Sequence, residues 1–141
     1  MEIQHQIFKE KNLLIQKYKG NFSVEKYKAQ VINMINNPDW EYVDIVLVDL
    51  RSINLKKILK HLGELVDIKE NILKKKYETI HLVDEPSTTV FSHLYKEQLE
   101  ERNYSIKYCS TIEKVVELLN SNTSENELEE MISNLEHTFL M

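Results

Sequence analysis

Two short polar segments hold the residues of this 141-residue chain whose types and spacing suit chemistry best. The segment 49–52 (Asp-Leu-Arg-Ser) follows one apolar run, and the segment 84–88 (Asp-Glu-Pro-Ser-Thr) follows another. Carboxylate, guanidinium and hydroxyl groups in this combination can hold a charged ligand or a partner group through hydrogen bonds. Ligands of open α/β sheets meet the carboxyl ends of the strands. We therefore predict a binding site for a protein partner or small ligand made of Asp49, Arg51, Ser52, Asp84, Ser87 and Thr88.

The same residues also have a purely structural interpretation. Short polar side chains after a strand often cap the helix that follows, and an Arg–Asp pair at a sheet edge is ordinary. If the two strands are neighbours, Arg51 can reach Asp84 or Asp49. The start of the helix after Pro86 would then offer free N–H groups to an anion. Both interpretations stay open, and the structural one is favoured.

Catalysis is the alternative hypothesis. A small acid–base enzyme would use Asp49, His81 and Asp84, and a relay of His81, Asp84 and Ser87 has the residue types of nucleophilic catalysis. A buried, hydrogen-bonded His81 and a packed Cys109 thiol are the simpler interpretations. We therefore expect no catalytic residue.

Scarce residue types exclude several other classes of protein. The two isolated glycines, Gly20 and Gly63, cannot form the Gly-rich phosphate loops of P-loop or dinucleotide-binding proteins. The single cysteine, Cys109, can form neither an internal disulfide nor a thiolate zinc site. None of the five histidines has the i, i+4 spacing of a helical metal pair. We expect no metal and no cofactor.

Charge and hydropathy predict a soluble, cytoplasmic protein. The chain has 18 basic and 23 acidic side chains, a net charge of −5, and only Arg51 and Arg102 among its basic residues are arginines. Nucleic acid is therefore not the expected partner. No apolar run reaches the roughly 18 residues of a membrane span. With 42% apolar residues, the chain has the length and composition of one domain, 1–141.

The apolar pattern predicts an α/β fold with the order ββαβαβαβαα. We expect a mixed, mostly parallel sheet of four to five strands with helices packed around it. Trp40 is interpreted as a lid over the edge of this sheet. The expected strands are 2–8, 12–18, 45–48, 77–83 and 104–108. The expected helices are 24–35, 55–66, one from 86 to about 99, one from 112 and one over 124–139. The helix that begins at 86 is expected to bury Val90. Ser23, Asn54, Ser110 and Ser124 are the expected helix caps, with a turn at Gly20-Asn21.

Several of these segments together resemble a known family. The hairpin, the segment 20–23 (Gly-Asn-Phe-Ser), the segment 37–40 (Asn-Pro-Asp-Trp), the strand end 48–51 (Val-Asp-Leu-Arg) and the segment 82–86 (Leu-Val-Asp-Glu-Pro) are similar to the STAS superfamily, in its SpoIIAA-like branch of small bacterial proteins. The resemblance covers about residues 1–120. It implies a non-catalytic domain that acts in binding or regulation.

The resemblance also implies a phosphorylation switch, and this chain departs from the sequence pattern of that switch. Anti-sigma-factor antagonists of the superfamily are switched by phosphorylation of a serine at the start of the helix after the central strand. This chain has Asn-Leu-Lys-Lys-Ile-Leu at 54–59, without a hydroxyl group, so Ser52 is only a displaced substitute. We expect phosphorylation of Ser52 to be dispensable.

Two expectations concern apolar surfaces. A carrier of an apolar small molecule is the third functional hypothesis, and an internal cavity of a few hundred cubic ångströms would favour it. The amphipathic helix predicted over 124–139, with the apolar end 139–141, either packs on its own sheet or mediates self-association. Packing on its own sheet is slightly favoured.

Overall fold

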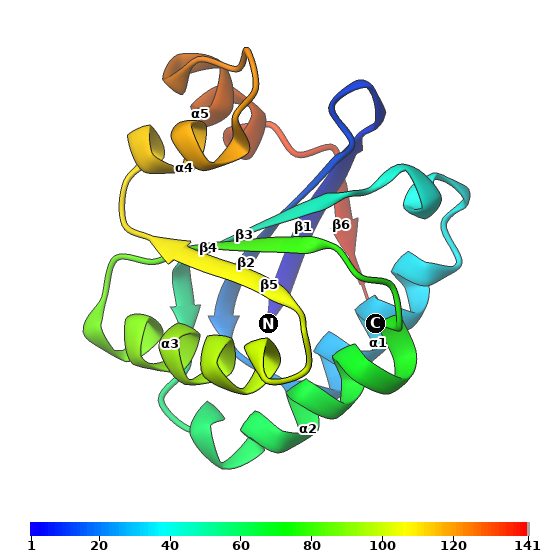
Figure 1. Cartoon of the computed structure of the whole chain (residues 1–141), viewed down its shortest axis with the longest axis vertical. Coiled ribbons are helices and arrows are strands. Elements are labelled where there is room, and N and C mark those ends of the chain that lie inside the picture. Colours follow the sequence, from blue (N-terminus) through cyan, green and yellow to red (C-terminus); the bar gives the residue numbers. More distant parts are fainter. Residues whose placement is uncertain (141) are drawn as a thin grey trace.

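A six-stranded mixed sheet forms the centre of the computed structural model, which describes residues 1–140 (Figure 1). The spatial order is β5-β4-β3-β2-β1-β6. The strands are β1 (Glu2–Phe8), β2 (Leu13–Asn21), β3 (Ile45–Asn54), β4 (Glu78–Leu82), β5 (Ser105–Cys109) and β6 (His137–Phe139). β2 to β5 run parallel, and β1 pairs antiparallel with both β2 and β6. The predicted α/β class is confirmed, but the prediction of four to five strands is wrong because β6 adds a strand.

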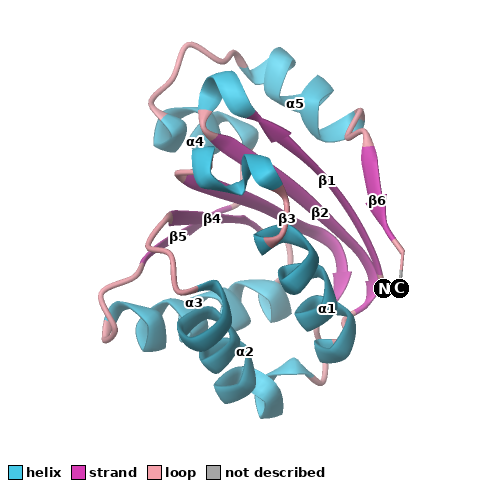
Figure 2. Ribbon diagram, turned by 90° about the vertical axis from the view of Figure 1, so that its right-hand side faces the viewer, coloured by secondary structure: helices cyan, strands magenta, loops and turns pink. Residues whose placement is uncertain are grey.

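Helices cover both faces of the sheet (Figure 2). One face carries α1 (Val24–Ile35), α2 (Leu62–Ile68) and α3 (Pro86–Glu100), and the other carries α4 (Ile112–Leu119) and α5 (Glu125–Ser133). Short helical turns are η1 (Lys9–Lys11), η2 (Pro38–Tyr42), η3 (Ile58–His61) and the π-helical η4 (Lys69–Leu73). Because side chains alternate along a strand, Val46 and Val48 enter the core under α1–α3, whereas Leu47 enters the core under α4 and α5.

Helix starts follow from side-chain caps. Ser23 accepts a hydrogen bond from the backbone N–H of Lys26 at 3.2 Å, and Ser124 accepts one from Glu127 at 3.1 Å, so both predicted caps are confirmed. The α4 cap is Thr111, one residue after the predicted Ser110.

The central strands are longer than predicted. Gly20 and Asn21 form no turn, because they pair with Ile53 and Asn54 and extend both β2 and β3. Gly20 has a φ of +87°, which its missing Cβ permits. Asn54 is therefore the last residue of β3 and not a helix cap. The predicted helix 55–66 is wrong in its first part, where the chain forms η3 before α2 begins at Leu62.

The end of the chain also differs from the prediction of a helix over 124–139. α5 ends at Ser133, and the next residues form β6, in which Phe139 lies opposite Ile3. The open edge of β1 supplies hydrogen-bond partners that a helical continuation would leave unpaired. Leu128 and Ile132 are buried on the sheet of the same chain, so the interpretation of self-packing is confirmed for this stripe. Met141 lies outside the described residues.

Two smaller predictions are settled by burial. Trp40 is buried, packs edge-on against Tyr77 and covers the α1–α3 core, as a lid would. Val90 is 49% exposed and does not face the core, because α3 buries Phe91, Tyr95 and Leu99 instead. Within residues 1–140, no helix has both the length and the apolar character needed to cross a membrane.

Candidate functional site

Asp49 and Arg51 form a close ion pair inside β3. Asp49 is 1% exposed, and its Oδ1 and Oδ2 accept hydrogen bonds from Nε and Nη2 of Arg51, each at 3.0 Å. The backbone N–H of Arg51 also donates to Oδ1. These hydrogen bonds raise the pKa of Arg51 above its ordinary value, and the charges of Asp84 and Glu129 add to the effect. The pair thus fixes Arg51 at the carboxyl end of the sheet, with its side chain 36% exposed.

Other predicted site residues border a hollow beside this pair. Arg51, Ser52 and Ser87 line a surface depression of about 410 Å³, together with Glu85. The register shift between Lys17 and Lys19 of β2 lies opposite this part of β3. Ser52 therefore belongs to a paired strand and not to the loop that the sequence predicted. The structure brings Arg51, Ser52 and Ser87 to one surface.

Three predicted residues do not line this hollow: Asp49, which is paired with Arg51 inside β3, Asp84 and Thr88. Thr88 is buried, and its hydroxyl donates to the backbone carbonyl of Glu85 at 2.9 Å, which stabilises the start of α3. Asp84 is exposed and acts on Arg51 only through its charge. Thr88 therefore fits the structural interpretation.

The predicted relay of His81, Asp84 and Ser87 does not form. His81 is buried and shares a hydrogen bond of 2.8 Å between its Nδ1 and Oγ of Ser92. Burial, together with a smaller effect of the nearby charge of Lys69, lowers the pKa of His81 to about 3, so the imidazole is neutral near pH 7. The partner is a side chain of α3, which the sequence did not single out.

Cys109 lies in surroundings that leave its thiol protonated, because burial outweighs the opposing charge of Lys114. Its thiol is half-buried, and burial raises its pKa above the ordinary value. A thiol in this state is poorly nucleophilic.

A larger groove adjoins the hollow at the same edge of the sheet. It has a volume of about 880 Å³ and shares Asn21, Asn54 and Lys56 with the hollow. Its walls are the start of α1 and the segment from Asn54 to Glu64. Four lysines line it, Lys28, Lys56, Lys57 and Lys60, together with His61, Glu25 and Glu64. We call it the lysine groove.

The charges of the lysine groove are unbalanced. Within residues 1–140, none of its four lysines forms an ion pair, while Glu64 is held by Nδ1 of His61 at 2.9 Å. This leaves a local excess of positive charge on a chain whose net charge is −5. Such a groove favours anions.

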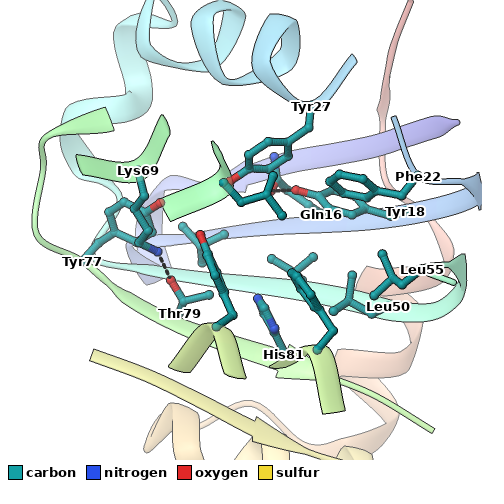
Figure 3. Close-up of a pocket in the computed structure, with 15 residues that line it drawn as sticks. Gln16, Tyr18, Phe22, Tyr27, Leu50, Leu55, Lys69, Tyr77, Thr79 and His81 are labelled. Atoms are coloured by element: carbon teal, nitrogen blue, oxygen red, sulfur yellow. Dashed lines mark hydrogen bonds between the residues drawn. The ribbon is translucent and has the colours of Figure 1, made fainter. Parts of the chain in front are cut away.

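A buried cavity lies between the sheet and α1, α2 and α3 (Figure 3). Its volume is about 50 Å³, which is far below the roughly 300 Å³ at which ligand pockets begin. The cavity thus gives no support to the carrier of an apolar molecule. Its walls combine aromatic rings with the polar side chains of Gln16, Lys69, Thr79 and His81.

Lys69 is the most unusual residue of this cavity. Its side chain is buried, and Nζ donates to Oγ1 of Thr79 at 2.8 Å and lies 4.3 Å from the centroid of the Tyr77 ring (Figure 3). Burial, together with a smaller effect of the charge of Lys76, lowers its pKa from 10.5 to about 7. No carboxylate among residues 1–140 forms an ion pair with it.

Sequence reasoning missed both Lys69 and the lysine groove. A lysine within an apolar stretch, Leu65-Val66-Asp67-Ile68-Lys69, was the available signal for the first. The run Lys56-Lys57 with Lys60 was the signal for the second. The run alone did not predict a groove, because the opposite wall is the start of α1. The chain matches no known protein-family model and no curated protein sequence.

Proposed function

We propose that this protein is a non-catalytic, STAS-like binding domain whose ligand is a small anion held in the lysine groove. The observation that carries the proposal is the groove itself, about 880 Å³ in volume and lined by four lysines without ion-pair partners within residues 1–140. Its volume lies in the range of small-molecule sites. The hollow with Arg51 extends it.

Electrostatics and position favour this assignment over a protein partner. An exposed lysine in water gains little from a single carboxylate, but several lysines around one concave surface act together on one anion. The groove also lies beyond the carboxyl end of β3, the edge at which α/β sheets bind ligands. In the family that the chain resembles, a serine near this place receives a phosphate. Here Lys56 and Lys57 would attract an anion instead.

Anion binding to paired variants tests the proposal. Inorganic phosphate, pyrophosphate and citrate would be titrated into the protein by calorimetry at low salt, because screening weakens such binding as ionic strength rises. We expect at least one of the three anions to bind wild type. The variant K56Q/K57Q/K60Q should lower that affinity at least tenfold. The control K9Q/K17Q/K114Q removes the same charge outside the groove and should bind like wild type.

Two results would overturn the proposal. Equal losses in both triple variants would mean that only net charge matters and that the groove has no special role. No binding of any of the three anions to wild type at low salt would also exclude the proposed site.

A further inference from the structure

Lys69 differs from the other lysines in its surroundings. It is 2% exposed, whereas the four lysines of the groove are all exposed. Its Nζ donates a hydrogen bond to the Thr79 hydroxyl, and no ion pair neutralises it among residues 1–140. A buried ammonium without a counter-ion is costly, whereas a neutral amine is not. The site therefore favours an amine with a free lone pair.

The local backbone holds this amine against the cavity. Lys69 begins the π-helical turn η4, a rare conformation that is frequent at functional sites. The turn ends at Lys74, whose φ of 57° is unusual for a residue with a Cβ. The Tyr104 hydroxyl lies 3.4 Å from the backbone oxygen of Lys69. The position of the side chain is thus fixed from both sides, by Thr79 in the sheet and by this turn.

A neutral amine in a cavity is a nucleophile for carbonyl carbon. We propose that Lys69 forms a reversible imine with a small aldehyde or ketone that enters the cavity beside Tyr77 and Thr79. The site is separate from the lysine groove, which meets the cavity only at Phe22 and Leu55. This proposal does not rest on the anion-binding function.

The reaction needs no further reagent. The lone pair of Nζ forms a bond to the carbonyl carbon, and the oxygen takes up a proton to give a carbinolamine. The carbinolamine then loses its hydroxyl group and the remaining hydrogen on Nζ as water. The C–O bond breaks, and a C=N bond forms. Hydrolysis reverses every step, so the site binds the carbonyl compound covalently without consuming it.

The volume of the cavity limits the size of the ligand. A buried water needs about 10–15 Å³ of such volume, so the cavity of about 50 Å³ has room for about three to five atoms of that size. Acetaldehyde has three non-hydrogen atoms and acetone has four. Benzaldehyde has eight and should be excluded.

The groups around Nζ keep the amine reactive near neutral pH. Its pKa of about 7 leaves half of the amine neutral at pH 7, whereas an ordinary lysine with a pKa of about 10.4 is neutral in less than one molecule in a thousand. The titratable groups that surround it are Tyr27 on α1, His81 on β4, Tyr95 on α3, and Tyr77, Tyr104 and Lys76 in the adjoining segments. None of these groups carries a negative charge at pH 7, so none supplies a counter-ion for the ammonium, which the rings of Tyr77 and Tyr104 stabilise only partly through cation–π contacts.

Reductive trapping tests this proposal. Wild-type protein would be incubated at pH 7 with acetaldehyde and cyanoborohydride, which reduces an imine to a stable secondary amine, and the modified lysines would be mapped by mass spectrometry. We expect Lys69 to be modified at least tenfold faster than the exposed Lys114. Acetone should modify Lys69 more slowly, and benzaldehyde should modify exposed lysines but not Lys69.

Two variants sharpen the result. Lys69→Arg keeps a positive charge but cannot form the imine, so this adduct should disappear while the other lysines react as before. Thr79→Val removes the hydrogen bond and keeps the amine, so modification of Lys69 should persist. A Lys69 that is unmodified, or modified no faster than Lys114 in wild type, would overturn the proposal without any need for a variant to fold. Equal modification by benzaldehyde would overturn it as well, because the cavity would then not select the ligand.

Discussion

The two faces of the sheet differ in what they bury. The buried residues of the core under α4 and α5 are all aliphatic: Leu13, Ile15, Leu47, Ile80, Leu82, Ile112, Val115, Leu119, Leu128 and Ile132. Phe8, Cys109 and Met131 are partly buried and pack against them. The core under α1–α3 also has many apolar residues, but polar groups and a cavity lie among them. The core under α1–α3 therefore surrounds a cavity with polar side chains, whereas the buried residues of the other cluster are all aliphatic.

Strand β4 shows this difference within four residues. Thr79 and His81 enter the polar cavity, and Ile80 and Leu82 enter the aliphatic core. β2 repeats the pattern with Gln16 and Tyr18 on the cavity side and Leu13 and Ile15 on the other. Two adjacent positions of a strand point to opposite faces, so each strand serves both. Most polar groups of these two strands thus lie on the α1–α3 face, whereas the buried carboxylate of Asp49, two residues after Leu47 in β3, lies on the other face.

The largest expected effect comes from the aliphatic face. Leu82→Ala should lower the free energy of unfolding by about 2–5 kcal/mol, because a fully buried leucine leaves a cavity that the packed core cannot fill. Thr79→Val on the other side of the same strand should cost less, about 1–3 kcal/mol, because it leaves Nζ of Lys69 without this acceptor. Urea unfolding of both variants measures the difference. Equal losses would contradict the division of the two faces.

The pH dependence of stability should come from the core under α1–α3, which contains Lys69 and His81. The pKa of Lys69 falls from 10.5 in the unfolded chain to about 7 in the fold, so between these values the unfolded chain binds more protons. The free energy of unfolding contributed by Lys69 therefore rises with pH across this window, by at most about 1.4 kcal/mol per pH unit. We expect Lys69→Met to remove this slope between pH 7.5 and 9.

Urea unfolding at several pH values separates this slope from other effects. Lys114→Met provides the control, since this lysine is exposed, and it should keep the wild-type slope. The pKa of His81, lowered from 6.5 to about 3, works in the same direction at lower pH, where the free energy of unfolding falls as the pH drops below 6.5. A wild-type slope in Lys69→Met would show that the amine is not the titrating group.

Local patterns predicted most of the fold. The continuous apolar run at 45–48 and the capping residues Ser23 and Ser124 identified a buried strand and two helix starts without any tertiary information. The ends of β2 and β3 were missed because Gly20 and Asn21 are typical turn residues, and only pairing with Ile53 and Asn54 keeps them in a strand. β6 was missed for the same reason, since its partner β1 is more than a hundred residues away.

The sites depended far more on tertiary structure. Arg51 and Ser52 could be proposed because they directly follow an apolar run, and the structure places them on one surface with Ser87. Lys69 could not, because a lysine in a partly apolar helix normally reaches solvent along its flexible chain. Its burial results from the π-helical turn and from Tyr77 and Thr79, which lie after that turn in the sequence.

The smallest expected effect concerns Gln30 on α1. It tests whether the buried polar side chains of the α1–α3 core all have hydrogen-bond partners. Its side chain is 1% exposed, and Nε2 has no hydrogen-bond partner among residues 1–140. A buried donor without a partner costs about 1–3 kcal/mol, part of which an apolar side chain of similar shape recovers. Gln30→Met should therefore leave the free energy of unfolding unchanged or raise it by up to about 1 kcal/mol.

Gln16→Met is the matched control and should lower the free energy of unfolding, because Oε1 of Gln16 accepts a hydrogen bond from the Tyr18 hydroxyl at 3.0 Å. Urea unfolding of both variants decides the point. A loss of more than about 1 kcal/mol in Gln30→Met would mean that the amide is hydrogen-bonded in solution, so that the hollow of about 20 Å³ beside it holds water and the α1–α3 core is hydrated beyond the Lys69 cavity.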